Sequence, residues 1–350
     1  MVKAKNMALY MLKRILIMIP MLFLVLLATF TLTTFMSQNL LLNQMESFFP
    51  TIEQLEAEKI RIGYYDPWFI KVLRYFANFF QGNWGISYIV SNNLPVLDLL
   101  AQIYPKTLEL VMIPIILIPI ISVKLGIVSA KNRNKMKDTG IRGIIMLAVC
   151  IPSFWLATMI QYIVGTVVTD LTYGTINLQV MFPNSVSIRY EPITGFRILD
   201  AILLNDQVLL HDTLLHLYLP CFCLILVTFA FITRQTRASM LDVMQKNYVR
   251  TARAKGVPDK DVINKHTLRN ALIPTSTAII ATTAGLLTGT LFIEMAFNYK
   301  GMGQYMIMAM NMGDYVVISG ILVISSMIIL FGTLAADILY TIIDPRIVYT

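Results

Sequence analysis

Few residues of this sequence carry reactive side chains, and their spacing predicts neither a catalytic nor a metal site. The three histidines, His211, His216 and His266, are scattered without a metal-ligand spacing. Cys221 and Cys223 lie two positions apart on a predicted helix and point to different faces, so no metal or redox pair is indicated. The sequence holds no nucleophile–base set, no paired carboxylates and no Gly-x-x-x-x-Gly-Lys-Ser/Thr loop that would cradle ATP phosphates. We therefore expect a protein that is not an enzyme and carries no metal.

Polar side chains inside apolar segments are the candidates for a transport path. Glu294 falls near one end of such a segment, where a carboxylate is costly; it lines a pore or meets a substrate amine, or it forms a structural pair. Asp337, near the end of the last apolar segment, has Lys124 as its candidate partner, which favours a structural pair. Three threonines, Thr282, Thr283 and Thr288, carry hydroxyls that either line a polar pore or bond to carbonyls of their own helix.

A basic segment between two apolar ones, residues 247–270, predicts a helix, a sharp turn and a second helix. Ala252 favours the first helix, and Gly256 can end it in the left-handed conformation. Pro258 suits the first turn of the second helix, and Asp259 lies near the positive end of that helix. Such a compact elbow fits a groove on another protein, although an ordinary basic loop between two spans remains the alternative.

Composition identifies the elements that must position these residues. The chain has 350 residues, of which 57% are hydrophobic and 14% are charged, whereas soluble domains have roughly 25% charged residues. The apolar residues form long blocks, and a helix needs about 20 of them to cross a bilayer with its backbone polar groups satisfied. We predict an all-α membrane protein with about six spans.

The blocks divide the chain into segments. Residues 1–36 hold the N-terminal tail and the first span, and residues 37–106 form an extracytoplasmic segment with short helices at the membrane surface. A core of five spans covers 107–345, with an extended outer loop at 169–213 and a cytoplasmic loop at 233–273, and residues 346–350 form a tail. The spans are expected at about 15–35, 108–130, 141–168 (broken at Pro152), 214–232, 274–297 and 316–342.

The net charge of +8 sets the expected orientation. The basic residues gather in short segments between spans, and residues 131–142 are the clearest case. Because short cytoplasmic loops are enriched in Lys and Arg, both termini are predicted to be cytoplasmic. The same distribution argues against a nucleic-acid partner.

Several short motifs together resemble one family. The run Arg-Thr-Ala-Arg-Ala-Lys-Gly at 250–256, followed by His-Thr-Leu-Arg-Asn-Ala-Leu-Ile-Pro at 266–274, resembles the ATPase-contacting loop of binding-protein-dependent ABC importer permeases. It is most similar to the B-type subunit of the oligopeptide, dipeptide and nickel transporters. Further similar motifs follow in order over nearly the whole chain, at 65–67, 82–85, 151–154, 234–240, 292–294, 301–304 and 343–347.

The resemblance implies a type I ABC importer permease fold and a pore-forming subunit that imports oligopeptides or dipeptides by alternating access. It implies a homologous second permease, two ATP-binding subunits that hold ATP and Mg, and an extracellular or periplasmic binding protein. It also implies a multi-pass protein of the bacterial or archaeal plasma membrane, with no cofactor on this chain. A coupling helix is implied at 257–266 after a turn at 252–256, with contacts to the ATPase from Arg250, Thr251, Ala252, Ala254, Lys255, Gly256, Val257, Asp259, His266 and Asn270.

Two features depart from the general pattern of such permeases. Arg250 stands where many of them have an acidic residue, which is usual for the B-type branch. The outer loop at 169–213 is long and lacks a Leu-Pro-x-Gly-Gly turn, so contacts with a binding protein are not carried over there. The alternatives are a permease for nickel or another metal chelate, and an ATP-independent secondary transporter.

Overall fold

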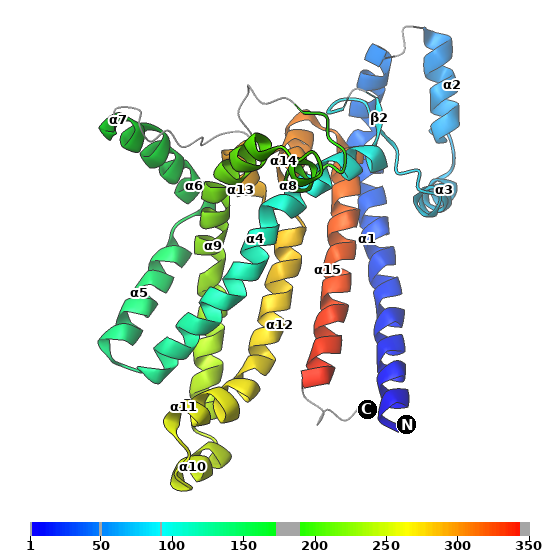
Figure 1. Ribbon diagram of the computed structural model, residues 1–350. Coiled ribbons are helices and arrows are strands. Elements are labelled where there is room, and N and C mark those ends of the chain that lie inside the picture. Colours follow the sequence, from blue (N-terminus) through cyan, green and yellow to red (C-terminus); the bar gives the residue numbers. More distant parts are fainter. Residues whose placement is uncertain (1, 49–50, 92, 173–189, 344–350) are drawn as a thin grey trace.

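The computed structural model describes residues 2–48, 51–91, 93–172 and 190–343. Long helices run roughly side by side in it, with short helices at both ends of the bundle (Figure 1). Within the described residues, five helical runs are long and apolar enough to cross a membrane. They contain α1 (Val2–Phe48), α4 (Val96–Lys131), α9 (Gln207–Met244), α12 (Leu268–Leu287) and α15 (Tyr315–Ile343).

The sixth predicted span is a bent pair of helices. α5 (Met136–Cys150) and α6 (Ser153–Tyr162) meet at 98°. The bend falls at the expected break, because Pro152 has no N–H to donate and biases Ile151 before it to an extended backbone, here with φ −85° and ψ 120°. The π-helical turn η1 (Ile163–Val168) and α7 (Thr169–Leu171) follow. Counting the bent pair as one span gives the expected total of six.

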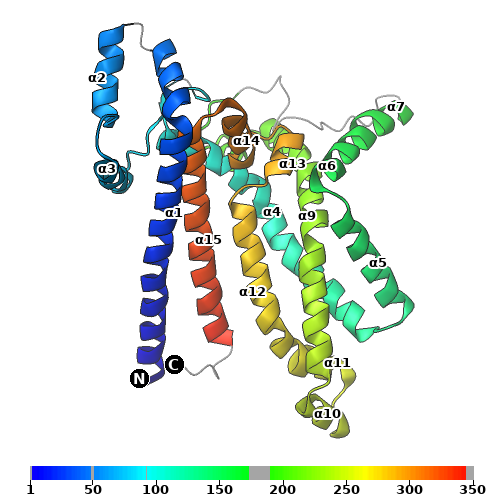
Figure 2. The same cartoon turned by 180° about the vertical axis from the view of Figure 1, so that it is seen from behind.

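Short helices lie at the two ends of the bundle (Figures 1 and 2). One end holds α8 (Arg197–Leu203), α13 (Leu291–Ala296) and α14 (Met302–Met312). The opposite end holds α10 (Asn247–Ala254), α11 (Asp259–Asp261) and the π-helical turn η2 (Val262–Thr267). Part of the predicted outer loop, residues 173–189, lies outside the described residues.

The segment after the first span contains the short helices that the sequence predicts, α2 (Ile52–Ile62) and α3 (Trp68–Phe80). A two-residue antiparallel pair follows, β1 (Ile86–Ser87) with β2 (Leu94–Pro95). α3 packs its aromatic residues on α1, with the rings of Phe76 and Phe23 4.9 Å apart. The limits predicted for this segment, 37 and 106, do not coincide with helix ends, because α1 continues to Phe48 and α4 begins at Val96.

α4 and α9 cross closely at the centre of the bundle. A Cβ added at Gly126 would lie 2.5 Å from the Cβ of Thr236, so only glycine permits this approach. Ser122 Oγ donates a hydrogen bond to the carbonyl oxygen of Phe229 at 3.2 Å. Small residues and interhelical hydrogen bonds are the usual basis of helix association in membranes, where lipid weakens the hydrophobic driving force.

α1 and α15 lie side by side in both views (Figures 1 and 2) and are joined by an ion pair. Arg14 Nε lies 3.1 Å from Asp337 Oδ2. The structural pairing expected for Asp337 is present, but Lys124 was the wrong partner. Lys124 is exposed on α4, whereas Arg14 comes from the helix that packs directly on α15.

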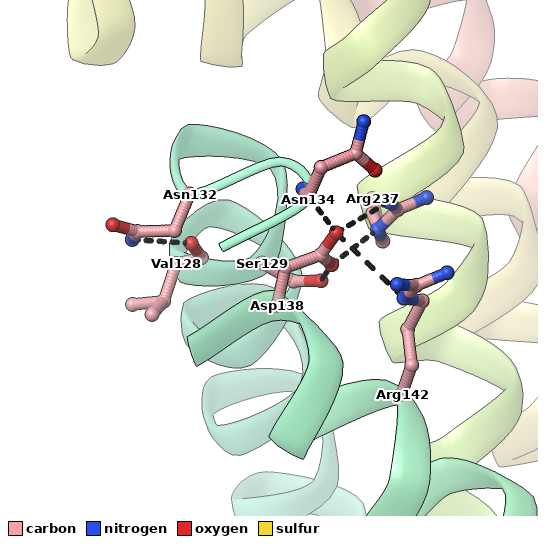
Figure 3. A network of polar contacts seen from close by, with 7 residues as sticks. All are labelled: Val128, Ser129, Asn132, Asn134, Asp138, Arg142 and Arg237. Atoms are coloured by element: carbon pink, nitrogen blue, oxygen red, sulfur yellow. Dashed lines mark hydrogen bonds and ion pairs between the residues drawn. The ribbon is translucent and has the colours of Figure 1, made fainter. Parts of the chain in front are cut away.

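A buried carboxylate fastens α4, α5 and α9 together (Figure 3). The turn between α4 and α5 lies toward the end of the bundle that holds α10 and α11 (Figure 1). Asp138, in the first turn of α5, is fully buried. Its oxygens accept hydrogen bonds from Ser129 Oγ at 2.5 Å, from the amide of Asn134 at 2.9 Å, and from Arg237 Nε and Nη2 at 2.8 Å each. Two parallel bonds from one guanidinium are both strong and directional. Arg142 lies farther from the carboxylate, at 3.7 Å.

We expect Arg237→Ala to lower the free energy of unfolding by roughly 3–5 kcal/mol, because it leaves the Asp138 carboxylate buried and unpaired. Arg142→Ala removes a longer contact made by a half-exposed side chain and should cost less than about 1 kcal/mol. Unfolding of both variants in detergent micelles measures the difference. Equal losses in the two variants would contradict the assignment of Arg237 as the main partner.

Candidate functional site

The predicted elbow is a helix, a left-handed turn and a second helix. α10 ends where Gly256 takes φ +77°. The amide of Gly256 donates to the carbonyl of Arg253 at 3.0 Å and that of Val257 to the carbonyl of Ala252 at 3.2 Å, which is the Schellman pattern of a glycine-ended helix. Pro258 stands directly before α11 with φ −54°. An N–H at this position would have no acceptor within the helix, so its absence from proline costs no hydrogen bond.

One face of the elbow is anchored in an apolar cluster. Val249 and Ala252 of α10 pack with Val262 and Ile263 of η2 against the ends of α4 and α9, represented by Ala130, Met240 and Val243.

Two further contacts hold the second helix in place. Asn270 Nδ2 donates to Tyr248 Oη at 2.9 Å, and Thr267 Oγ1 donates to the carbonyl of Val262 at 3.0 Å. The elbow is therefore packed directly on the ends of α4 and α9 and held to α12 through Asn270.

The other face of the elbow is exposed, and most of the predicted contact residues lie on it. They are Arg250, Thr251, Ala254, Lys255, Gly256, Asp259, His266 and Asn270. Val257 is half-buried and Ala252 is buried. The exposed cations Arg253, Lys260, Lys265 and Arg269 make this face strongly basic.

The expected division of the elbow was partly wrong. Residues 252–256 were predicted as the turn, but Ala252 and Ala254 are helical and the reversal occupies 255–258. α11, η2 and α12 then follow one another directly, so the second arm of the elbow continues into a long apolar helix. Alanine is the strongest helix former, which explains why α10 extends as far as it does.

The three candidate pore threonines lie along α12 and at its end. Thr282 and Thr283 are half-buried on the helix. Thr288 caps the C-terminus of α12, and its hydroxyl donates to the carbonyl of Gly285 at 2.7 Å. For Thr288 this contact matches the alternative in which the hydroxyl bonds to a carbonyl of its own helix. Their role in a substrate path stays a prediction.

Glu294, the fourth candidate, is fully buried in the hairpin of α13 and α14. Its Oε1 accepts from Thr107 Oγ1 and from the Thr290 amide, both at 3.1 Å. Its Oε2 accepts from the amides of Gly303 and Gln304 at 2.7 and 3.1 Å. These two amides belong to the first turn of α14, where a negative charge is stabilised. Of the two alternatives, the contacts favour the structural role.

Small residues make this arrangement of the hairpin feasible. A Cβ at Gly303 would lie 2.7 Å from the backbone of Leu291, and one at Gly301 would collide with the side chains of Thr107 and Glu294. Sequence reasoning missed both Thr107 and Tyr248 as site residues. Thr107 is 187 positions from Glu294 and Tyr248 is 22 positions from Asn270, and no local pattern connects such pairs.

We expect Glu294→Ala to destabilise the protein by roughly 3 kcal/mol, because several buried donors lose a charged acceptor at once. Glu294→Gln keeps one acceptor oxygen and should cost less. Thermal unfolding in detergent measures both, and Glu191→Ala, which removes an exposed acid, serves as the control. Two stable variants that equally fail to transport would instead support a contact between Glu294 and the substrate.

Comparison with known proteins identifies the family. Residues 122–349 match the model of the binding-protein-dependent transport system inner membrane component. The chain is 33% identical over 345 residues to the oligopeptide transport system permease protein AppB of Bacillus subtilis, covering 98% of this chain and 100% of that protein. It is 34% identical over 348 residues to the dipeptide transport system permease protein DppB of Alkalihalophilus pseudofirmus, covering 97% and 99%. It is 33% identical over 297 residues to the dipeptide transport system permease protein DppB of Escherichia coli K12, covering 84% of each. The chain therefore belongs to the family of inner membrane components of binding-protein-dependent transport systems, the permease subunits of ABC importers.

Proposed function

We propose that this chain is one half of the membrane pore of an importer for oligopeptides or dipeptides. The support comes from the relatives, whose names carry these substrates and which match the chain over nearly its full length. A nickel or metal-chelate substrate is not favoured, because these relatives are named for peptides. An ATP-independent transporter is not favoured either, because the family is one of ABC importer permeases.

The single observation that carries the mechanism is the exposed elbow of α10 and α11. It presents a basic, solvent-facing surface, while its opposite face is held in the apolar cluster that includes Met240 of α9. A docking point joined in this way to two long helices converts the movement of a partner into movement of the bundle. We infer that separate ATP-binding subunits, which hold the ATP and Mg, dock here, one on this chain and one on a homologous second permease.

The arrangement of the ends supports the proposed orientation. α1 begins and α15 ends at the end of the bundle that holds the elbow, and the basic turn between α4 and α5 lies there as well (Figure 2). Because positive loops stay in the cytoplasm, we assign this end to the cytoplasm of a bacterial or archaeal cell. The opposite end, with α8, α13 and α14, then faces the extracellular or periplasmic binding protein.

Transport follows from alternating access between these two faces. ATP-driven closure of the ATPases moves the elbow, and α9 and α12 carry that movement into the membrane. Thr282 and Thr283 of α12 are our candidates for hydroxyls that meet the peptide as it passes, since they lie half-buried on the helix that the elbow moves directly.

We expect Gly256→Pro to abolish peptide-stimulated ATP hydrolysis and peptide uptake by the complete importer in proteoliposomes. Proline fixes φ near −65° and removes the amide that closes the turn, whereas Gly256 has φ +77°. Because the elbow lies at the end of the bundle, the variant should still insert into the membrane.

Gly256→Asn is the matched control. Asparagine tolerates the left-handed conformation, and a Cβ at this position meets nothing within 4 Å. The asparagine variant should keep most of the activity. Normal coupling in the proline variant would refute the role proposed for the elbow.

A further inference from the structure

A second site lies at the end of the bundle opposite the elbow. A cavity of about 340 Å³ opens there between the start of α4, the segment before α8 and the turn between α13 and α14. Three cationic side chains, Lys106, Arg197 and Lys300, and two tyrosines, Tyr190 and Tyr299, line it. Figure 1 shows α8 and α14 at this end of the bundle. None of these residues takes part in the elbow.

The positive charge of the cavity is only partly balanced, since the buried carboxylate of Glu109 attracts Arg197 without forming a close ion pair. Among the described residues, no carboxylate lies within ion-pair distance of Lys106, Arg197 or Lys300. The guanidinium of Arg197 lies 5.3 Å from the ring centre of Tyr190. Its Nη1 is buried and has no hydrogen-bond acceptor within the described part of the chain. Buried donors are almost always paired, so this nitrogen marks a position that suits an acceptor from outside the chain.

Two buried acids are hydrogen-bonded to the cavity walls, whereas Glu191, between the lining residues Tyr190 and Pro192, is exposed. Glu109 is buried, and its oxygens accept from the amide of Ile198 at 2.6 Å and from Tyr299 Oη at 3.0 Å. Asp200 is also buried, and it accepts from the hydroxyl and amide of Thr194 at 2.6 and 2.8 Å. Burial alone would raise the pKa of Asp200, but these hydrogen bonds hold its pKa below the ordinary value. These carboxylates fix the cavity walls, and their printed hydrogen bonds go to Ile198, Tyr299 and Thr194 rather than to the three cations.

We propose that this cavity binds the C-terminal carboxylate of the peptide substrate at the outer face of the permease. The inference rests on the proposed peptide function. A carboxylate is the planar anion that a guanidinium binds through parallel hydrogen bonds, with lysines adding charge. The volume lies within the range of small-ligand pockets and leaves room for a terminal residue beside the carboxylate. Gln102, also in the lining, adds an amide that can bond to the peptide backbone.

The experiment compares dialanine, which ends in a free carboxylate, with dialanine amide, which does not. Binding of each to the complex of permeases and ATPases is measured in nanodiscs of phosphatidylcholine without the binding protein, so that the selectivity of that protein does not enter. We expect the free acid to bind about tenfold more tightly, the value of one charge-assisted hydrogen bond. Lys300→Gln and Arg197→Gln should each reduce this preference, because they weaken binding of the free acid more than binding of the amide.

Lys71→Gln is the matched control, because it removes one positive charge from α3, outside the cavity. It should keep the full preference for the free acid. Lys300 is exposed, so its substitution tests the proposal even where a variant of the half-buried Arg197 folds poorly.

Three results would overturn the proposal. The first is equal binding of acid and amide, or no binding of the acid, by the wild-type complex. The second is a preference for the free acid that survives in both cavity variants. The third is loss of the preference in nanodiscs of phosphatidylglycerol, which would assign it to a lipid phosphate. A failure of the peptide function itself is distinguishable, since the complete importer would then take up no peptide in proteoliposomes.

Discussion

The hydrogen-bonded charge pair of Asp138 and Arg237 is the interaction on which the elbow end of this permease depends. The donors to the Asp138 carboxylate, which belongs to α5, come from α4, from the turn after α4 and from α9. A buried carboxylate is tolerated only where such donors converge, so the pair specifies how these three elements meet. α9 leads directly to α10, so this pair positions the elbow together with the apolar cluster that includes Met240.

The end of the bundle opposite the elbow uses buried carboxylates in the same way. Glu294 joins the first turn of α14 to Thr107 of α4. Asp314 accepts from Ser87 Oγ at 2.7 Å and from the amide of Val317 at 3.2 Å, and so joins β1 to the first turn of α15. Each acid stabilises the positive end of one helix and fixes a segment that is distant in sequence. In a bundle surrounded by lipid, where apolar burial discriminates poorly between helix arrangements, such bonds determine which helices pair.

The sequence predicts those features that depend on neighbouring residues. The spans follow from apolar blocks, the break at Pro152 from proline chemistry, and the turn at Gly256 from its freedom to adopt positive φ. Helix limits were less accurate, because α4 and α9 continue through polar residues such as Lys106 and Arg237 that end a hydropathy block but not a helix. The pairing of Arg14 with Asp337 and the role of Glu294 depend on contacts between distant segments, which a single sequence does not encode in any local pattern.

The helical path from the elbow to the hairpin of α13 and α14 is interrupted between α12 and α13. The helical run from α11 to α12 ends at Leu287, and Gly289 has φ +111°, a conformation open to few residues other than glycine. Beyond it, the hairpin is fixed to α4 through Glu294 and Thr107, and a Cβ at Gly289 would lie 3.1 Å from the amide nitrogen of Gly303. Under the proposed mechanism, the ATPase moves α12 from below while α4 holds the hairpin from above. The movement of α12 relative to the hairpin then concentrates in the break between α12 and α13. At this break the carbonyl of Thr288 accepts a hydrogen bond from the hydroxyl of Ser325 of α15 at 3.4 Å. The close packing that excludes a side chain at Gly289 thus places the junction of the moving and fixed parts next to the candidate substrate path.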